Sequence, residues 1–225
     1  MSSIVFVDSR VENRTALIAA FPVDSTFVEL QSNQDGLQQI ASALTGYKNL
    51  SAIHIVSHGS VGAVYVGATV INNQNIASYE QLLAGIGNSL NENGDILVYG
   101  CDIAGGEEGN HFVNQLAHFT GADVAASTNI TGVGGDWQLE KKTGVIESEF
   151  ILLSTYQSSL AVTDGFVVDV YGTEGVDWQI NGSEHNNRMY GYGGGDYMYG
   201  NEGSDTIDGG AGNDYLKAAM IMTYY

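Results

Sequence analysis

The chain has 225 residues, of which 44% are hydrophobic, enough for one full-sized domain with a buried core and a smaller appendage. Its 26 acidic residues against 7 basic ones give a formal charge of -19. This charge excludes the basic surface that nucleic acid or anionic lipid requires, and it makes cations the expected partners. No stretch is long and apolar enough to span a membrane, and the opening MSSIVFVDSR lacks the pattern of a signal peptide.

The first 150 residues alternate short apolar runs with helical patterns, which is typical of βαβ units and a mainly parallel sheet. Near-continuously apolar runs predict buried parallel strands over residues 3–8, 25–30, 50–57, 95–100 and 122–127. Helical spacing of apolar residues predicts helices over residues 12–20, 35–44, 76–90 and 109–119. Residues 63–71 and 137–147 predict small hairpins or edge excursions outside the parallel core.

From about residue 165 glycine and aspartate dominate, and a nine-residue repeat appears. Against the pattern G-G-x-G-x-D-x-U-x, the last three copies keep glycine at positions one and four, aspartate at position six and an apolar residue at position eight. The glycines and aspartates concerned are Gly191, Gly194, Asp196, Gly200, Gly203, Asp205, Gly209, Gly212 and Asp214. The copy from Gly182 is degenerate, with His185 and Asn187 in the key places. An earlier GTEGVD, residues 172–177, opens in the same way but is followed by one extra residue.

This pattern resembles the hemolysin-type (RTX) calcium-binding repeats of secreted bacterial proteins. Nine residues can hold a six-residue turn and a three-residue strand, so that turns stack on each side of a parallel β-roll. Aspartate side chains and turn carbonyls are the hard oxygen ligands that Ca²⁺ prefers. The alternative, a disordered glycine-rich tail, does not explain the apolar residue at position eight of each copy. We therefore predict Ca²⁺ as the cofactor, held in the turns by the aspartates and glycines of the last three copies.

Two core strands end in residues that could carry chemistry. The strand 50–57 is followed by His58 and Gly59, and the next core strand ends at Gly100 and Cys101, the only cysteine of the chain. Active sites of open parallel sheets lie beyond the carboxyl ends of the strands. If these two strands are neighbours, the imidazole and the thiol therefore lie at the same edge of the sheet. The adjacent glycines leave backbone N–H groups exposed, as an oxyanion site requires. The structural alternatives are a small buried cysteine and a hydrogen-bonded turn histidine.

The stretches HIVSHG and ILVYGCDIA resemble the histidine-glycine and cysteine motifs of the caspase-like cysteine peptidases, a clan that includes gingipains, separases and CHAT domains. Residues 4–148 resemble most an uncharacterised bacterial domain family found near the N-termini of large secreted or surface proteins. For that family IVFVDSR, DGLQQIASAL, TGADVAAST and GGDWQLE also fit. The resemblance implies Cys101 as nucleophile, His58 as general acid/base and the Gly59 N–H in the oxyanion site. The chain departs from the caspase pattern around the cysteine, where YGCDIAGG lacks the flanking glutamine and arginine.

The resemblances together predict an α/β fold: a caspase-like (flavodoxin-like) three-layer, mainly parallel sheet followed by a short C-terminal parallel β-roll. We expect the α/β domain over residues 1–153, a linker over 154–164, the roll over 165–217 and a tail over 218–225.

Two functions stay open. One is a cysteine endopeptidase that acts on a polypeptide substrate or on its own chain, and the other is a non-enzymatic module of a calcium-binding bacterial adhesin or surface protein. A flavodoxin-like cofactor binder is disfavoured, because VDSRVEN stands where a phosphate-binding glycine loop would follow the first strand. The calcium repeats predict a secreted or cell-surface protein, exported by a leaderless, type I-like route and folded outside, where calcium is abundant.

Overall fold

The computed structural model divides into two compact units near residue 161. It describes residues 3–19, 21, 25–151, 156, 158–160, 167–182, 186–201 and 203–218, with the backbone only for 167–169. Most of the expected linker, His185 of the degenerate repeat and nearly all of the expected tail lie outside the described residues.

The first unit is built on a six-stranded sheet in the order β2-β1-β3-β7-β8-β9. Its strands are β1 (Ser3–Asp8), β2 (Thr26–Leu30), β3 (Leu50–Val56), β7 (Leu90–Tyr99), β8 (Asp123–Ala126) and β9 (Lys141–Lys142). The pairs among the first five strands are parallel, and β9 pairs antiparallel with β8 at the edge. The predicted parallel sheet is thus confirmed. Its strand order reverses between β1 and β3, the place where doubly wound sheets accept ligands beyond the strand ends.

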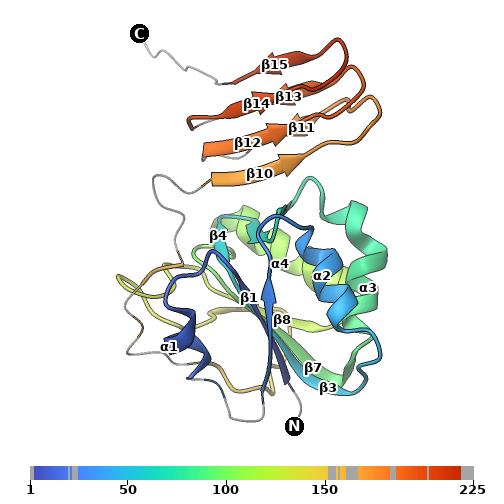
Figure 1. Ribbon diagram of the computed structural model, residues 1–225. Helices are drawn as coiled ribbons and strands as arrows, with labels where there is room; N and C mark the ends of the chain where they lie inside the picture. The colour runs from blue at the N-terminus through green and yellow to red at the C-terminus, as the bar shows by residue number, and fades with distance from the viewer. Residues whose placement is uncertain are drawn as a thin grey trace. The chain divides into compact units, whose positions relative to one another are not determined.

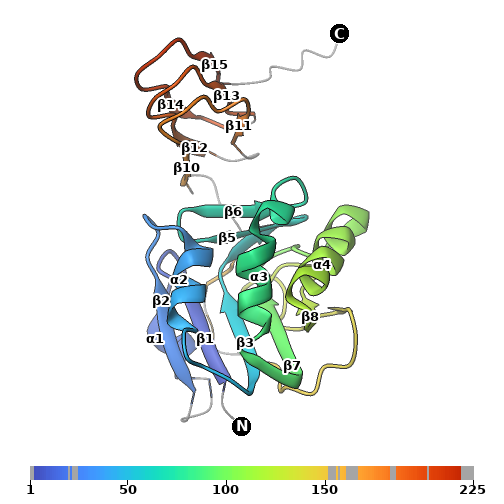
Figure 2. The same ribbon diagram turned by 90° about the vertical axis from the view of Figure 1, so that its right-hand side faces the viewer.

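Both faces of this sheet are covered, which explains why its strands are almost continuously apolar. Helices α2 (Gly36–Ala43), α3 (Glu80–Gly87) and α4 (Gly106–Thr120) cover one face, whereas the short α1 (Arg14–Ile18) lies on the other (Figures 1 and 2). The helical face buries Ile4, Phe6, Leu37, Ile40, Ile53, Leu83, Ile96, Phe112 and Val113. The opposite face buries Val5, Val7, Leu17, Ala52, Leu97, Tyr99, Trp137, Tyr156 and Leu160. Much of this second cover therefore comes from the chain that follows β8.

The predicted helix 76–90 is shorter than expected. It begins as a 3-10 turn, η1 (Ile76–Tyr79), continues as α3, and gives way to β7 at Leu90, which pairs with Leu50. Glycines near its end weaken the helix, and a Cβ on Gly87 would lie 1.7 Å from the Thr120 carbonyl oxygen of α4. The helix thus stops where close contact with α4 requires a glycine.

The two predicted excursions differ in the structure. Residues 63–71 fall within a separate three-stranded sheet made of β4 (His58–Ser60), β5 (Ala63–Val66) and β6 (Thr69–Asn72). Within 137–147 the structure has β9, which extends the main sheet. His58 and Gly59 therefore begin an antiparallel strand, in which they pair with Tyr65 and Val64.

The second unit consists of two three-stranded parallel sheets, in the orders β10-β12-β14 and β11-β13-β15 (Figure 1). Its strands are β10 (Val167–Tyr171), β11 (Ile180–Asn181), β12 (Asn186–Tyr190), β13 (Tyr197–Tyr199), β14 (Thr206–Asp208) and β15 (Tyr215–Lys217). Met189 pairs with Ile207 and Met198 with Leu216, 18 positions further on. Neighbouring strands of one sheet are thus two repeats apart, as stacked coils require. Between Val170 and Met189 the offset is 19, which accommodates the extra residue after the first turn.

The apolar residue at position eight forms the core of this unit. Met189 and Met198 are fully buried together with Ile180, and Ile207 packs against them. Leu216, in the last described strand, stays 46% exposed. Among the described side chains, β11, β12 and β13 each supply one buried apolar residue, a core too thin to hold many acidic turns together by apolar burial alone.

Candidate calcium sites and a candidate cysteine site

The six-residue turns of the second unit stack on one another through their backbones. Turns 172–177, 191–196 and 209–214 form one stack, in which Tyr197 N donates to Asp177 O at 2.9 Å and Tyr215 N donates to Asp196 O at 2.7 Å. The copies that begin at Gly182 and Gly200 form the second stack, where Asn201 Nδ2 donates to Gly182 O at 3.0 Å. Stacking places the aspartates at position six in line.

Asp196, Asp205 and Asp214 each use one carboxylate oxygen to accept a backbone N–H from the preceding coil. Asp196 Oδ1 accepts from Asp177 N at 2.9 Å, and Asp214 Oδ1 accepts from Asp196 N at 3.0 Å. Asp205 does the same with Asn187 N at 2.9 Å. The second oxygens of Asp196 and Asp205 are buried without a hydrogen-bond partner, and Asp196 is 0% exposed. A buried anionic oxygen without a partner is costly unless a cation compensates it.

The glycines at position one make room for these oxygens. A Cβ on Gly191 would lie 2.5 Å from both Asp196 Oδ2 and the Gly209 carbonyl oxygen. A Cβ would meet the equivalent carboxylates at 2.2 Å on Gly200 and 2.5 Å on Gly209. A carboxylate oxygen and a carbonyl oxygen thus converge beside Gly191 and beside Gly200, an arrangement that suits a hard cation.

Position four is glycine for a different reason. Gly194, Gly203 and Gly212 have φ values of +124°, +102° and +151°, which side-chain-bearing residues adopt only with strain.

Asp177 is not among the aspartates predicted from the last three copies, because its turn is followed by one extra residue. The structure places that turn in the first stack, where Asp177 N contacts Asp196 and the Asp177 carboxylate accepts from Thr173 N at 2.7 Å. The opening GTEGVD was the signal that could have found it. Among the described residues no three His, Cys, Asp or Glu side chains form a group that could hold a metal ion. Backbone carbonyls must therefore complete any calcium site here.

Burial raises the pKa of the Asp205 carboxyl, and the hydrogen bond from Asn187 N opposes that rise. The direction shows that the site disfavours an uncompensated negative charge.

The second candidate site lies at the carboxyl ends of β3 and β7. These strands are neighbours, with Val56 opposite Tyr99, so His58 and Cys101 follow adjacent strand ends as the sequence predicted. Both side chains are buried, at 7% and 2% exposure, rather than open to solvent. Cys101 belongs to the apolar cluster on the sheet face opposite α2, α3 and α4.

The contacts of the thiol and the imidazole are mainly with backbone. Thr131 N donates to Cys101 Sγ at 3.1 Å, and Ser159 Oγ lies 3.7 Å from the sulfur. His58 Nδ1 contacts Leu160 O at 3.0 Å, and Nε2 contacts Arg10 O at 3.4 Å. Burial raises the pKa of the Cys101 thiol and lowers the pKa of the His58 imidazole. Both shifts favour a neutral thiol and a neutral imidazole in this state.

Gly59 packs tightly beside the cysteine. A Cβ on Gly59 would lie 2.4 Å from Ile103 Cγ1 and 3.1 Å from the Cys101 carbonyl oxygen. Its amide nitrogen lies 3.4 Å from where a Cβ on Gly100 would be. The main chain of Gly59 therefore runs against the cysteine segment, as an oxyanion-binding N–H in this place would require.

The acidic side chain at the end of β1 is fully engaged. Asp8 is 0% exposed and forms an ion pair with Arg10 Nε at 2.8 Å, and its Oδ2 accepts from Gly67 N at 2.7 Å. Asp8 is thus a structural group that fixes Arg10, whose carbonyl contacts His58.

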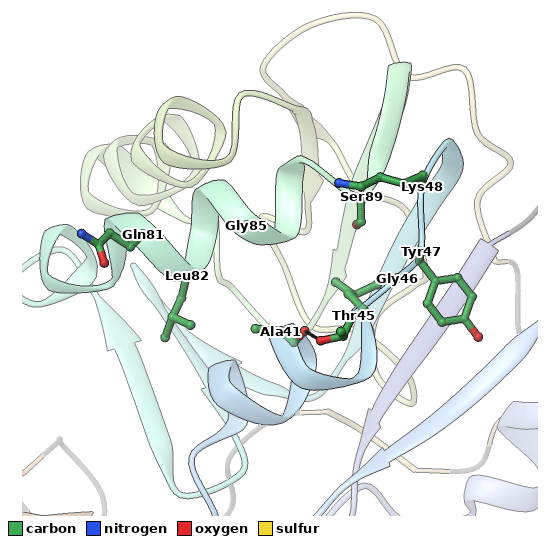
Figure 3. A pocket seen from close by; sticks show the side chains of 10 residues that line it. Ala41, Thr45, Gly46, Tyr47, Lys48, Gln81, Leu82, Gly85 and Ser89 are labelled. Carbon is green, nitrogen blue, oxygen red and sulfur yellow. Dashed lines mark hydrogen bonds between the residues drawn. The ribbon is translucent and has the colours of Figure 1, made fainter.

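A pocket of about 240 Å³ lies at the other end of the same strands (Figure 3). It is lined by Ala41, Leu44, Thr45, Gly46, Tyr47, Lys48, Gln81, Leu82, Gly85 and Ser89. Its only charged lining residue is Lys48, whose ammonium donates to Asn88 O at 3.2 Å. The lining holds no nucleophile paired with a base, so we assign no chemistry to it.

Comparisons with known proteins agree with the two-part organisation. Residues 4–161 match a family described as a domain of unknown function (DUF4347), and residues 181–216 match the RTX calcium-binding nonapeptide repeat, present in four copies. None of the curated proteins matches. Among solved structures, an aromatic-amino-acid aminotransferase from Burkholderia pseudomallei aligns at 15% identity with a TM-score of 0.34. The alignment covers 56% of this chain and 31% of that chain, a likeness too slight to carry an argument.

Repeats of the RTX type bind calcium ions and are typical of secreted proteins, and the predicted cofactor is thereby confirmed. No helix in the described part of the chain has the length and apolar character needed to cross a membrane. The chain belongs to the DUF4347 family and carries RTX calcium-binding repeats after that domain.

Proposed function

We propose that this chain is a calcium-dependent extracellular module, whose β-roll over residues 165–217 completes its folding only when Ca²⁺ enters the stacked turns. The observation that carries the proposal is the second oxygen of Asp196, fully buried and without a hydrogen-bond partner. A cation compensates the cost of burying such a carboxylate oxygen. Calcium supplies that charge and prefers oxygen ligands.

The proposed ligands are the aspartates at position six together with turn carbonyl oxygens. In the first stack Asp177, Asp196 and Asp214 stand one coil apart, so that Ca²⁺ would bridge consecutive turns. Asp205 would serve the second stack, where Asn187 replaces the partner aspartate. The glycines at positions one and four keep the turns open for these oxygens. We expect the first stack to bind calcium more tightly, because its turns carry more carboxylates.

This chemistry supports folding after export. A chain with 26 acidic residues and no bound cation repels itself, so low calcium inside a cell keeps the roll unfolded and millimolar calcium outside drives its folding. We infer on this ground a type I-like export route, in which the chain crosses the membrane unfolded.

The test compares wild type, Asp196→Asn and Glu92→Gln by circular dichroism and thermal unfolding, with chelator and with millimolar Ca²⁺. Glu92 is exposed in β7, so its variant makes the same charge change outside the roll. We expect calcium to add β-structure and stability to wild type and Glu92→Gln, by about 3 kcal/mol at a hundredfold excess over Kd. Asp196→Asn should lose most of that gain. A wild-type protein indifferent to calcium would refute the proposal.

A second proposal concerns the α/β domain, residues 1–153: a cysteine endopeptidase with Cys101 as nucleophile, His58 as general acid/base and the Gly59 N–H in the oxyanion site. Its support is the pairing of β3 with β7, which brings both residues to one sheet edge, and the backbone segment 158–160 lying against them. In this chemistry the His58 imidazole takes the proton of the Cys101 thiol, and the thiolate attacks a peptide carbonyl. The imidazolium then protonates the leaving amine as the C–N bond breaks, and water hydrolyses the thioester to free the thiol.

Mass spectrometry of the full chain with Ca²⁺, wild type beside Cys101→Ala, tests the peptidase. A cut in wild type that is missing from the variant supports it. Identical intact masses over long incubation, with added unfolded polypeptide also uncut, favour the non-enzymatic surface module.

A further inference from the structure

The segment that lies against Cys101 and His58 is held by an isolated antiparallel β-bridge. Residues 158–160 run antiparallel to residues 131–133: Val133 N donates to Ser158 O at 3.0 Å, Leu160 N donates to Thr131 O at 2.9 Å, and Ser159 bridges to Gly132. This is the pairing by which an extended polypeptide is added to an exposed backbone edge.

The same segment contacts both residues of the candidate cysteine site. Ser159 Oγ lies 3.7 Å from Cys101 Sγ, and Leu160 O accepts a contact of 3.0 Å from His58 Nδ1. Leu160 is 0% exposed within the apolar cluster that contains Cys101. A backbone carbonyl thus lies against the imidazole, a small side chain lies against the thiol, and an apolar side chain is buried in the same cluster as the thiol.

The opposing segment is shaped for this contact. Gly132 has a φ of +103°, and a Cβ there would lie 2.4 Å from Ser158 O. Ser158 is fixed from the other side, because Asn13 Nδ2 donates to its hydroxyl at 2.6 Å and that hydroxyl contacts Glu12 Oε2 at 3.1 Å. Residues 158–160 are therefore also anchored by Asn13 and Glu12, two side chains outside the candidate cysteine site.

We propose that residues 131–133 are a polypeptide-binding edge, that residues 158–160 are its built-in occupant, and that their displacement uncovers Cys101 and His58 for an extended polypeptide of similar character: a small residue facing the thiol, followed by an apolar one. The proposal deepens the peptidase function, but the uncovering itself requires no catalysis. The Cys101 thiol is then latent, because residues 158–160 of the same chain cover it.

The test uses the rate at which iodoacetamide alkylates Cys101 in the full chain with Ca²⁺, followed by intact mass. Because the chain has one cysteine, each modified molecule reports this site. Wild type should react slowly and the urea-unfolded chain fast. Gly132→Ala, whose methyl collides with Ser158 O, should react at least about tenfold faster than wild type, the change expected for about 1.4 kcal/mol lost from closure.

Gly134→Ala is the matched control. Gly134 has a φ of +91° in the same loop, yet no atom lies within 4 Å of its Cβ position. Its variant therefore introduces comparable backbone strain without touching residues 158–160, and it should react nearly as slowly as wild type. Equal acceleration in both glycine variants would mean general loosening of the loop and would overturn the proposal.

A second variant leaves the edge intact and removes the occupant. Leu160→Asp places a charge in a buried apolar position, so the segment should detach and alkylation should accelerate. A synthetic peptide of residues 155–162, TYQSSLAV, should then slow the reaction again, whereas the same peptide with aspartate for leucine should not. Fluorescence of the buried Trp137 verifies that the domain stays folded. Wild-type kinetics in folded Leu160→Asp, or no rescue by the peptide, would also overturn the proposal.

The outcomes separate this inference from the peptidase itself. Faster alkylation in Gly132→Ala and Leu160→Asp, without any cleavage of the peptide or of the chain, would support the built-in occupant and refute the peptidase function. Slow alkylation in every folded variant would refute the proposal that residues 158–160 are a displaceable occupant. It would not affect the proposal that the roll binds calcium.

Discussion

His54 provides a test of how this core responds to pH. Its ring lies between Phe21 and Tyr99, with centroids 5.5 and 6.1 Å away, and its Nδ1 is buried without a hydrogen-bond partner. Burial lowers the pKa of His54 from 6.5 to about 4. Above pH 6.5 both the folded and unfolded states hold a neutral ring, so the residue adds no pH dependence there. Between pH 6.5 and 4 only the unfolded chain takes up the proton, so the free energy of unfolding falls as the pH falls.

The size of this effect follows from the two pKa values. A difference of about 2.5 pH units corresponds to about 3 kcal/mol of lost stability at pH 4, or about 1.4 kcal/mol for each pH unit crossed. His54→Phe should remove this slope, because phenylalanine keeps the ring and cannot be protonated. At pH 7.5 the variant should lie within about 1.5 kcal/mol of wild type, since the two rings are similar in volume.

Urea unfolding between pH 4.5 and 7.5 at saturating Ca²⁺ measures the slope. The chain has two tryptophans, and Trp178→Phe in every protein leaves Trp137, buried against Tyr99, as the reporter of the α/β domain. His118→Gln, at an exposed position of α4, is the control and should keep the wild-type slope. Burial also lowers the pKa of His58, and that contribution remains in all variants. Equal slopes in wild type and His54→Phe would refute the burial argument.

Two further predictions concern the ion pair and a strained turn. Arg10→Met should destabilise the α/β domain by about 3–5 kcal/mol in urea unfolding, because it leaves the buried Asp8 carboxylate without its cation; a loss below about 1 kcal/mol would contradict this. Tyr192 has a φ of +68° at position two of its repeat and stacks on Tyr171. Both Tyr192→Gly and Tyr192→Ala lose the stacking, so they differ only in how well they tolerate the positive φ. The glycine variant should be more stable than the alanine variant by about 1 kcal/mol in thermal unfolding, and the reverse order would show that the left-handed turn is unstrained.

The sequence predicted the elements that follow from periodicity. All five parallel strands and the four helical regions are present, because each carries its own apolar pattern. The register of the roll was also predictable, since an 18-residue offset is twice the repeat length. The end of α3 was not, because it depends on the contact between Gly87 and Thr120, a tertiary contact that no local pattern encodes.

The contacts around Cys101 could not be predicted from the sequence either. The pattern of strand ends placed His58 and Cys101 at one edge, and β3 does pair with β7. Nothing near either residue indicates that Ser159 and Leu160, some 60 residues after the cysteine, lie across them. That contact depends on the irregular chain after β8, which has no periodicity to read.

The topology of the sheet alone explains why His58 and Cys101 lie at one edge, so their proximity does not by itself establish a catalytic site. Any residues that follow the ends of adjacent parallel strands arrive at one edge, whether or not they react. A reactive thiol additionally requires a lowered pKa and access to solvent. In this state burial gives Cys101 the opposite of both, with 2% exposure and a raised pKa. The chemical meaning of the motif therefore depends on whether residues 158–160 can leave, which the alkylation rates measure directly.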